Sequence, residues 1–463
     1  MKKAVIVFLA LMVLLSSCGK EEDKENTKDN TIIDQALPEV MYDDIAGTEG
    51  LSYEVPESKP GILVDLQGYK SDEDKTIIFV CDKPLSGCNI VDAASGEVVL
   101  TTDLIETTSD EGYHYYADIS SLTEPGTYYA QTDLIGRSYD FKISDDIYSS
   151  MRNQAVEDII SHQAAADRDV INESQALSLM LMAYELNPDY FEDLDGNGIA
   201  DVLDAARNSA NFLLTMQDSI GAVAVSGHCD NPEADDPVWT RGEDSNDATL
   251  VYAAALANFA RCYRQYDGDL ADKCLYSSET AYKYVTLSQV EDYNKEYCYM
   301  ADACLYKTTG IEDYGIRCNE HKEAYPDTSN FIGDFAYLTT SKTADITICT
   351  GIINSYAKEA ENISNFTSKD NYFISQNISS NEDIHVRILE DMLVMSYMNY
   401  LITNKEYRTV IQNHMHYLCG ENEDSRDYLE DEILEGDNYL YYRAEELFIL
   451  SSIDVKYKVP EQN

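Results

Sequence analysis

Two aspartates stand just before a strongly apolar segment of the chain. Asp167 and Asp169 lie in ADRDVINESQALSLMLMAYEL, where apolar residues recur at helical spacing from about residue 172 to 187. Carboxylates at the mouth of an active site could act as general bases. Alternatively, these short polar side chains could sit in a turn and accept hydrogen bonds from backbone amides at the start of the helix.

A second group of oxygen-bearing residues has the spacing of a calcium loop. In DLDGNGIADVLD, residues 193–204, such side chains occupy positions 1, 3, 5, 9 and 12, and a glycine occupies position 6. We expect a structural calcium site, with aspartate in place of the usual bidentate glutamate. The alternative is a turn that caps the helix expected from about residue 200. The candidate ligands are Asp193, Asp195, Asn197, Asp201 and Asp204.

Trp239 is the single tryptophan of the chain, and it stands in the loop DDPVWTRGEDS before an expected helix. Aromatic side chains provide large amphipathic faces against which a sugar ring can stack. Trp239 is therefore a candidate substrate-binding residue, although 36 tyrosines could serve in the same way.

The charge of the chain excludes several classes of partner. Against 33 lysines and arginines there are 85 aspartates and glutamates, which gives a formal charge of −52. Such a chain repels nucleic acid phosphates and anionic lipid headgroups. We therefore expect a neutral or cationic partner, and no nucleic acid.

The N-terminus indicates export and lipidation. Lys2 and Lys3 precede an apolar run, Ala4 to Leu15, which is followed by LSSC. This pattern predicts a signal peptide over residues 1–17 and lipid attachment at Cys18. We expect a protein outside the cytoplasm, attached to a bacterial envelope only through this lipid.

Cysteines could form disulfides in such a compartment. The chain has eleven, and their spacing contains no CxxC pair. Cys81 and Cys88 share one predicted β segment, and Cys262 and Cys274 flank a helix turn, so one or two bridges are compatible with the sequence. The pairing cannot be deduced from spacing alone.

Hydrophobic patterning divides the rest of the chain into three parts. Residues 18–59 are polar and acidic and predict a linker. Residues 60–145 contain short β-rich runs separated by turns, which favours an antiparallel sandwich. Residues 146–458 are helical, with short connections that favour a toroid of paired helices. The expected helices span 148–162, 172–187, 201–217, 246–265, 270–287, 296–309, 342–360, 384–403, 406–419 and 441–453, with one or two weaker helices in 311–341.

Several segments resemble glycoside hydrolase family 9, the endoglucanase-type cellulases. ILVDLQGY, VDAASGEVV, SSLTEPGTYYAQ and GRSYDFKISDDIYSSM are similar to the N-terminal immunoglobulin-like module of one branch of that family. AYELNPDYFEDLDGNGIADVLDAARNSANFLLTMQD and YLCGEN resemble parts of its helical domain. The resemblance implies an all-β immunoglobulin-like sandwich followed by an all-α (α/α)6 barrel, whose open end binds a β-linked glucan.

The resemblance also implies inverting hydrolysis, in which two aspartates of a DAGD motif activate water and a glutamate protonates the leaving oxygen. Asn172 matches the family asparagine that follows the motif. Counting back without a gap places the motif on His162-Gln163-Ala164-Ala165, and no DAGD occurs elsewhere. Asp167 and Asp169 then remain only as candidates for a displaced base. The position of the acid falls on Asp437 or, with a shift of two, on Glu435.

Two functions follow from this pattern. The first is a surface lipoprotein for the use of cellulose-like polysaccharides, with impaired or lost catalysis and a glycan-binding or accessory role. The second is an active inverting hydrolase that uses relocated carboxylates. In both cases the partner is a polysaccharide or oligosaccharide.

Overall fold

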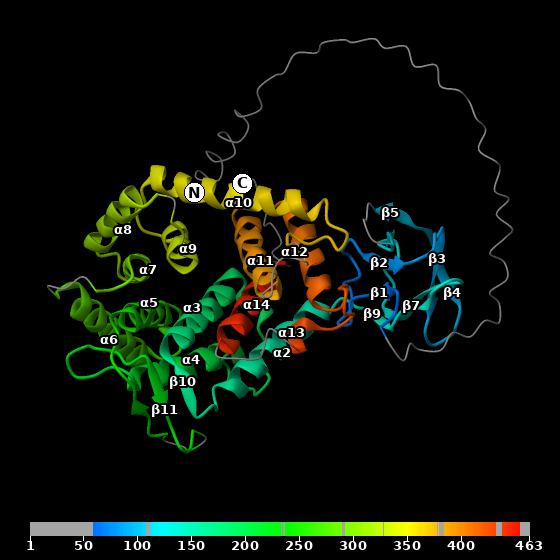
Figure 1. The fold of residues 1–463 in the computed structure, drawn as a ribbon. Helices are drawn as coiled ribbons and strands as arrows, with labels where there is room; N and C mark the ends of the chain where they lie inside the picture. The colour runs from blue at the N-terminus through cyan, green and yellow to red at the C-terminus, as the bar shows by residue number, and fades with distance from the viewer. Residues whose placement is uncertain are drawn as a thin grey trace, which may run out of the picture. The chain divides into compact units, whose positions relative to one another are not determined.

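The computed structural model of the protein describes residues 59–107, 112–232, 234, 237–288, 292–326, 328–376, 378, 384–431 and 438–453 (Figure 1). The chain from Lys59 onward forms one compact unit. The expected signal peptide, Cys18 and the linker as far as Ser58 lie outside the described residues. Among the helices of the described part, none is long and apolar enough to cross a membrane.

The first part of this unit is a β domain of two antiparallel sheets. One sheet has the order β1-β2-β6-β5, and the other has the order β4-β3-β7-β8, with β9 also paired to β7. Alternate residues such as Ile77 and Phe79 of β2 point into a shared core with Ile90 and Tyr115. The strands are β1 (Ile62–Leu63), β2 (Thr76–Cys81), β3 (Gly87–Asp92), β4 (Val98–Asp103), β5 (Ile105–Thr107), β6 (Tyr113–Asp118), β7 (Gly126–Thr132), β8 (Gly136–Arg137) and β9 (Phe141–Ile143).

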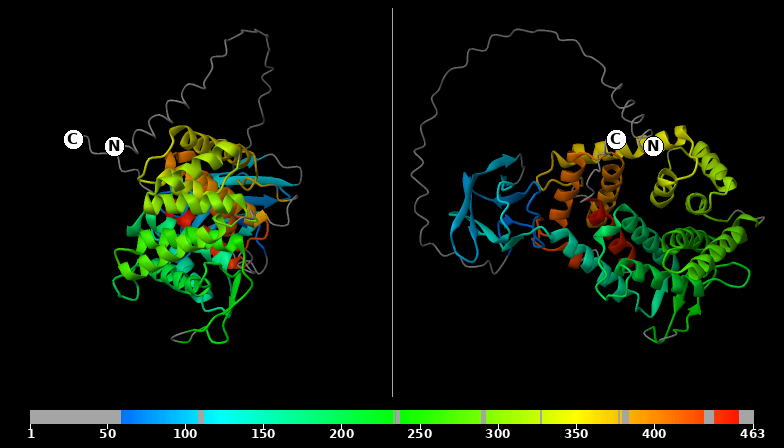
Figure 2. Two further views of the ribbon diagram at one scale, coloured as in Figure 1. Left: turned by 90° about the vertical axis from the view of Figure 1, so that its left-hand side faces the viewer. Right: turned by 180° about the vertical axis from the view of Figure 1, so that it is seen from behind.

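The second part is an (α/α)6 barrel in which successive helices alternate between an outer and an inner ring (Figures 1 and 2). The outer helices are α2 (Ile147–His162), α4 (Asp201–Thr215), α6 (Gly268–Thr286), α8 (Glu312–Ala324), α10 (Ile346–Thr367) and α12 (Lys405–Leu418). The inner helices are α3 (Val170–Leu186), α5 (Asn246–Tyr263), α7 (Lys295–Thr309), α9 (Phe331–Thr339), α11 (Ile384–Leu401) and α14 (Tyr439–Ile453). The predicted sandwich and the predicted barrel of paired helices are both confirmed.

The inner ring closes on itself. Helix α3 packs on α5, α5 on α7, α7 on α9, α11 on α14, and α14 on α3. Helix α9 contacts α11 through Phe335 and Tyr400, whose ring centroids lie 5.8 Å apart. Because α14 packs on α3, the first and last inner helices are neighbours. The inner helices are also surrounded by protein. A helix in such a place is apolar around its whole circumference, as the buried run Ala253-Ala254-Ala255 of α5 illustrates.

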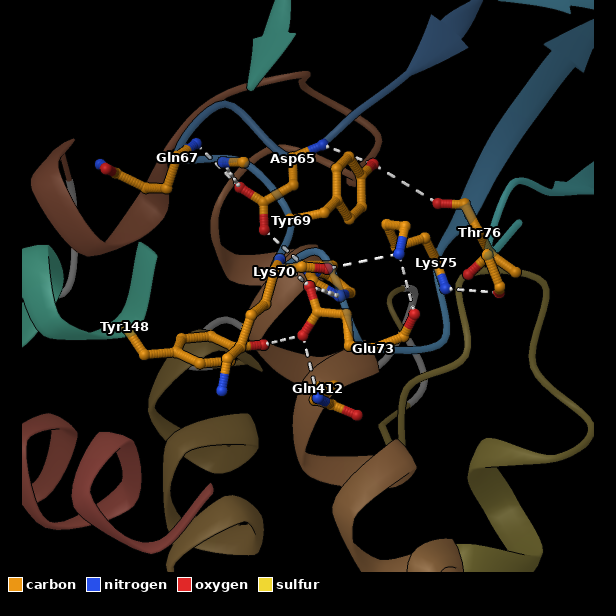
Figure 3. Close-up of polar contacts among 12 residues, drawn as sticks. Asp65, Gln67, Tyr69, Lys70, Glu73, Lys75, Thr76, Tyr148 and Gln412 are labelled. Atoms are coloured by element: carbon orange, nitrogen blue, oxygen red, sulfur yellow. Dashed lines mark hydrogen bonds and ion pairs between the residues drawn. The ribbon is translucent and has the colours of Figure 1, made fainter. Parts of the chain in front are cut away.

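A buried polar cluster joins the β domain to the barrel (Figure 3). On α12, His416 places Nδ1 2.6 Å from Oδ2 of Asp65, and its Nε2 lies 3.7 Å from Oε1 of Glu73. Gln412 donates to Glu73 at 2.9 Å, and the Tyr148 hydroxyl of α2 also donates to Glu73. Because the loop after β1 supplies both carboxylates, this loop fastens the β domain to two outer helices.

The same cluster perturbs the titration of its members. Burial alone lowers the pKa of His416, but the hydrogen bond to Asp65 and the charges of Glu73, Asp65 and Glu421 outweigh it and raise that pKa to about 9. Burial raises the pKa of Glu421 to about 8, although His416 and a hydrogen bond from Tyr69 oppose the rise. His416 and Glu421 therefore keep their protons to a higher pH in this interface than the same side chains would in water.

The cysteines are unpaired in this fold. All ten that the structure describes are free thiols, and seven of them are buried. Cys81 and Cys88 are not bridged, nor are Cys262 and Cys274. The disulfide bridges that the cysteine spacing allowed are therefore absent among the described residues. These cysteine side chains pack into the apolar cores instead.

Candidate active site

Several residues singled out from the sequence, among them His162, Asp169 and Asn172, lie at the end of the barrel where the inner helices begin, whereas the candidate calcium loop follows the other end of α3. The Asn172 amide of α3 donates to Oδ1 of Asn438, just before α14, at 3.0 Å. Beside this contact, the ring of His162 stacks on Tyr439 with centroids 4.7 Å apart. The segment before α3 and the segment before α14 therefore lie side by side, although more than 260 residues separate them in sequence.

Asp169 caps helix α3. Its backbone is extended, and its Oδ1 accepts a hydrogen bond from the Asn172 amide nitrogen at 2.8 Å. Asp169 therefore accepts a backbone hydrogen bond at the start of the helix, as in the second alternative drawn from the sequence. Burial, with smaller contributions from the charges of Asp247 and Asp169, raises the pKa of Tyr297.

Asp167 lies in a short strand and not in the turn that the sequence suggested. Strand β10 (Asp167–Asp169) pairs with β11 (Ser226–His228), which pairs with β12 (Thr240–Arg241). The register places Asp167 opposite His228, and Asp167 Oδ1 lies 2.7 Å from His228 Nδ1. The other ring nitrogen of His228 lies 3.2 Å from Asp230. No local pattern predicts this pairing, because the two strands are distant along the chain.

His228 is a functional candidate that sequence reasoning missed. Hydrogen bonds to Asp167 and Asp230 raise the pKa of His228. The imidazole and the Asp167 carboxylate are both exposed, with 52% and 83% of their side-chain surfaces accessible. An exposed histidine held by two carboxylates can carry a proton close to neutral pH and donate it to a ligand.

The four positions that resemble the family motif hold no carboxylate. Gln163 is buried and donates to the Ala205 carbonyl at 2.9 Å and to the Ser209 hydroxyl at 2.8 Å. Burial lowers the pKa of His162, whose ring stacks on Tyr439. Ala164 and Ala165 have no side chain that could hold or activate water. Gln163 and His162 are thus held by hydrogen bonding to α4 and by ring stacking.

A buried ion pair lies directly behind this stretch. Nε of Arg168 donates to Glu173 at 3.0 Å, and both side chains are nearly inaccessible to water. The Ser209 hydroxyl also donates to Glu173. Since Glu173 is already paired, it cannot serve as a free base for water.

Trp239 packs over the same arginine. The Arg168 guanidinium lies 4.1 Å from the ring centroid of Phe212 and 5.7 Å from that of Trp239. Phe212 meets Trp239 edge to face, with centroids 4.7 Å apart. Trp239 is half-buried, so one part of the indole is fixed by the scaffold and another part remains accessible at this end of the barrel.

Glu435 and Asp437, the candidates for the acid, lie outside the described residues. Their segment is bounded by the short helix α13 (Tyr428–Asp431) and by Asn438. Asn438, the first described residue after Asp437, accepts the hydrogen bond from Asn172.

The predicted cation loop brings three carboxylates together. Ligand oxygens of Asp193, Asp195 and Asp201 all lie within 4.8 Å of one another. Gly198, with φ of 88°, donates its amide to Asp193 at 2.8 Å and lowers the pKa of that carboxyl. Burial and the neighbouring carboxylates raise the pKa of Asp201. Three carboxylates whose oxygens converge repel one another. Such a set of oxygen donors is the kind that a hard cation prefers.

The other two expected ligands are occupied differently. Asp204 forms an ion pair with Arg207 at 2.8 Å, and its second oxygen accepts from the Asn197 amide at 2.7 Å. The Asn197 side-chain oxygen accepts from the Ile199 amide. Asp204, the twelfth position, lies in the first turn of α4, pairs with Arg207 of the same helix and does not join the three clustered carboxylates.

Comparison with known proteins agrees with the geometry. The model of the family described as "Glycosyl hydrolase family 9" matches residues 168–440, and that of the "Cellulase N-terminal ig-like domain" matches residues 57–137. The chain belongs to glycoside hydrolase family 9, with an N-terminal immunoglobulin-like domain.

A curated relative, Endoglucanase D of Acetivibrio thermocellus, is 22% identical over 400 residues, which cover 68% of this chain and 64% of the relative. The chain therefore spans less than two thirds of the length of that relative. Among solved structures, a metagenome-derived family 9 endoglucanase superposes with a TM-score of 0.74 at 19% identity, covering 85% of this chain and 98% of the other. Bacteroides ovatus GH9 has a TM-score of 0.71 at 17% identity, with 85% and 99% covered. At these identities the structures share the fold.

Proposed function

We propose that this family 9 member binds a β-linked glucan and has lost, or retains only weakly, the hydrolysis typical of the family. The observation that carries the proposal is the absence of a carboxylate at His162, Gln163, Ala164 and Ala165, together with the use of Asp169 as a helix cap. Inversion requires a carboxylate free to activate water, opposite an acid roughly 6.5–9.5 Å away.

Binding of a glucan is supported by the surroundings of the site. A solved relative, AaCel9A, which covers 84% of this chain at a TM-score of 0.69, is described in complex with cellobiose-like isofagomine. Trp239 offers a partly accessible aromatic face at the same end as Asp169. A neutral sugar also avoids the repulsion that the formal charge of −52 imposes on anionic partners.

In this proposal the protein acts as an accessory lipoprotein at a bacterial envelope. The LSSC sequence ending at Cys18 supports lipid attachment, and the polar residues that follow would tether the folded unit to the membrane. The role would be to capture or hold polysaccharide chains close to the cell.

The second candidate is an active inverting hydrolase with relocated carboxylates. The position of Asp167 favours it, because this carboxylate is exposed in β10, just before the helix that Asp169 caps. Asp167 and Asp169 would then act as the base, and Asp437 or Glu435 as the acid.

One experiment separates the two candidates. The chain from Gly19 onward, which keeps every described residue, is incubated with cellotetraose and with soluble β-glucan. We expect quenching or a shift of Trp239 emission, thermal stabilisation by sugar, and no reducing sugar above that of the Asp437→Asn and Asp167→Asn variants. Turnover that either substitution abolishes would establish the hydrolase. Absence of both binding and turnover would overturn both candidates.

We also propose that calcium binds Asp193, Asp195 and Asp201 as a structural ion. When bound, it would neutralise the mutual repulsion of these carboxylates and fix the turn before α4.

A further inference from the structure

We propose that a groove between the outer helices α10 and α12, far along the chain from the candidate active site, is a second binding site for one or two neutral pyranose rings. The groove has a volume of about 420 Å³, within the range of roughly 300–1,000 Å³ typical of small-molecule sites. Its lining residues come from the last turn of α10, the following loop and the first half of α12. They include Ser364, Thr367, Phe373, Thr409, Val410 and Asn413.

Helical spacing explains why these side chains share one groove. Ser364, Thr367 and Ser368 lie three and four residues apart on α10, so they occupy one face of that helix. Thr409 and Asn413 have the same relation on α12. Two helices thus present small hydroxyl and amide groups toward a common space.

One of these polar groups lacks a protein partner in the described part of the chain, and others keep the capacity to accept hydrogen bonds. The Ser364 hydroxyl is buried and has no hydrogen-bond partner among the described residues. The Thr367 and Ser368 hydroxyls donate to helix carbonyls, which leaves their lone pairs free to accept. A buried hydroxyl without a partner costs free energy, and a ligand that carries both donors and acceptors would recover it. Sugar hydroxyls have this property.

Phe373 supplies the apolar wall that a sugar ring requires. Its φ is 55°, a left-handed conformation that is rare for a bulky side chain. The loop is held in place because the Phe373 ring meets Tyr116 of β6 edge to face, with centroids 5.3 Å apart, while Tyr372 meets His114. Strain of this kind persists only where surrounding packing enforces it, and it is common at ligand contacts. The ring and Val410 provide a surface for the apolar face of a pyranose.

The charges beside the groove favour a neutral ligand. Lys405 is paired with Asp74 of the β domain at 2.9 Å, which offsets part of its attraction for an acidic sugar. Glu406 is exposed at the rim and repels anions. An uncharged hexose is not repelled by Glu406 and needs no cation from Lys405.

The site is tested by calorimetric titration of cellobiose and cellotetraose into the chain from Gly19 onward, with Trp239 emission recorded in parallel. Asn413→Ala removes an amide donor, and Phe373→Gly removes the ring while relieving the strained backbone. We expect each to weaken the calorimetrically detected binding by about tenfold or more. The matched control Asn354→Ala, on an exposed position of α10, should bind as the unaltered chain does.

The inference can fail independently of the proposed function. If Trp239 emission responds to sugar while the heat of binding is insensitive to Asn413→Ala and Phe373→Gly, the groove is not a sugar site and the proposed function stands. If binding depends on Asn413 and Phe373 while Trp239 emission stays constant, the groove is confirmed and binding at the barrel end fails. Absence of any heat with either sugar overturns the groove site.

Discussion

The side-chain amide of Asn172 donates to the side-chain oxygen of Asn438 at 3.0 Å, and this bond connects the starts of the first and last inner helices. Asn172 also donates its backbone amide to the capping carboxylate of Asp169 at 2.8 Å, so one residue joins the cap of α3 to the residue before α14.

The two opening aspartates should differ in their effect on stability. Asp169→Ala removes the cap of α3 and should lower the free energy of unfolding by about 1 kcal/mol, whereas Asp169→Ser should largely preserve it. Asp167→Ala removes only an exposed contact to His228 and should change stability little. Urea denaturation measures all three. Equal losses for Asp167→Ala and Asp169→Ala would contradict the capping role.

Removal of only one partner of the buried ion pair between Arg168 and Glu173 should destabilise the folded protein. Arg168→Met leaves Glu173 buried without its cation and should lower the free energy of unfolding by about 3–5 kcal/mol. The matched control Arg264→Met removes an exposed pair with Asp272 and should cost no more than about 1 kcal/mol. The double variant Arg168→Met/Glu173→Met should be more stable than Arg168→Met alone. An Arg168→Met protein as stable as the control would refute a structural role for the pair.

Stability should fall as the solution becomes more alkaline. The folded His416 keeps its proton up to about pH 9, while an unfolded histidine loses it near pH 6.5. The folded Glu421 keeps its proton up to about pH 8, while an unfolded glutamate ionises near pH 4.5. In both cases the folded state binds more protons, so the free energy of unfolding decreases with pH, each group contributing up to about 1.4 kcal/mol per pH unit.

Urea denaturation at pH 6.5, 7.5 and 8.5 measures this dependence. Glu421→Gln keeps an acceptor for the Tyr69 hydroxyl but removes one titrating group, so its profile should be flatter than that of the unaltered chain. If the two profiles run parallel, Glu421 does not contribute to the pH dependence.

Calcium should stabilise the chain through the loop before α4. A ligand that binds only the folded state adds about 2.7 kcal/mol at a concentration of 100 times Kd, so millimolar calcium should raise Tm. Asp195→Asn should abolish the increase, whereas Asp189→Asn, an exposed change nearby, should not. A calcium response that survives Asp195→Asn would place the ion elsewhere.

Reducing agents should leave Tm unchanged, because the described cysteines are free. A thiol-reactive dye should label Cys81 first in the folded protein, since Cys81 is partly exposed. Burial raises the pKa of Cys298 to about 12 and that of Cys262 to about 11, so both should react slowly. The remaining thiols should react only after unfolding. A Tm that falls with reductant would reveal a bridge.

The elements with strong local patterns were predictable from the sequence. Helical periodicity located α4, α5 and α7 within a few residues, because their apolar faces repeat clearly. The weaker segment 311–341 contains α8 and α9, as expected. The calcium-like loop was recognisable because its ligands are local.

The features that depend on distant pairing were not predictable. Strand β10 exists because Arg168 and its neighbours pair with Ser226–His228, and no short-range pattern indicates such a partner. The cluster of His416, Asp65 and Glu73 likewise joins residues at opposite ends of the chain. His414 and His416 form the only close histidine pair in the sequence, yet their spacing alone does not reveal the carboxylates that the fold places against His416.

Ring closure also bears on how the protein is made. Helix α14 packs on α3 and α2, and the β domain bonds to His416 and Glu421, so both parts need residues from the C-terminal region before their contacts are complete. Segments that emerge first during synthesis must therefore wait, with apolar helix faces uncovered, for the end of the chain. Loss of the last helix should consequently leave the N-terminal helices prone to aggregation, and a chaperone that holds the growing chain would protect them.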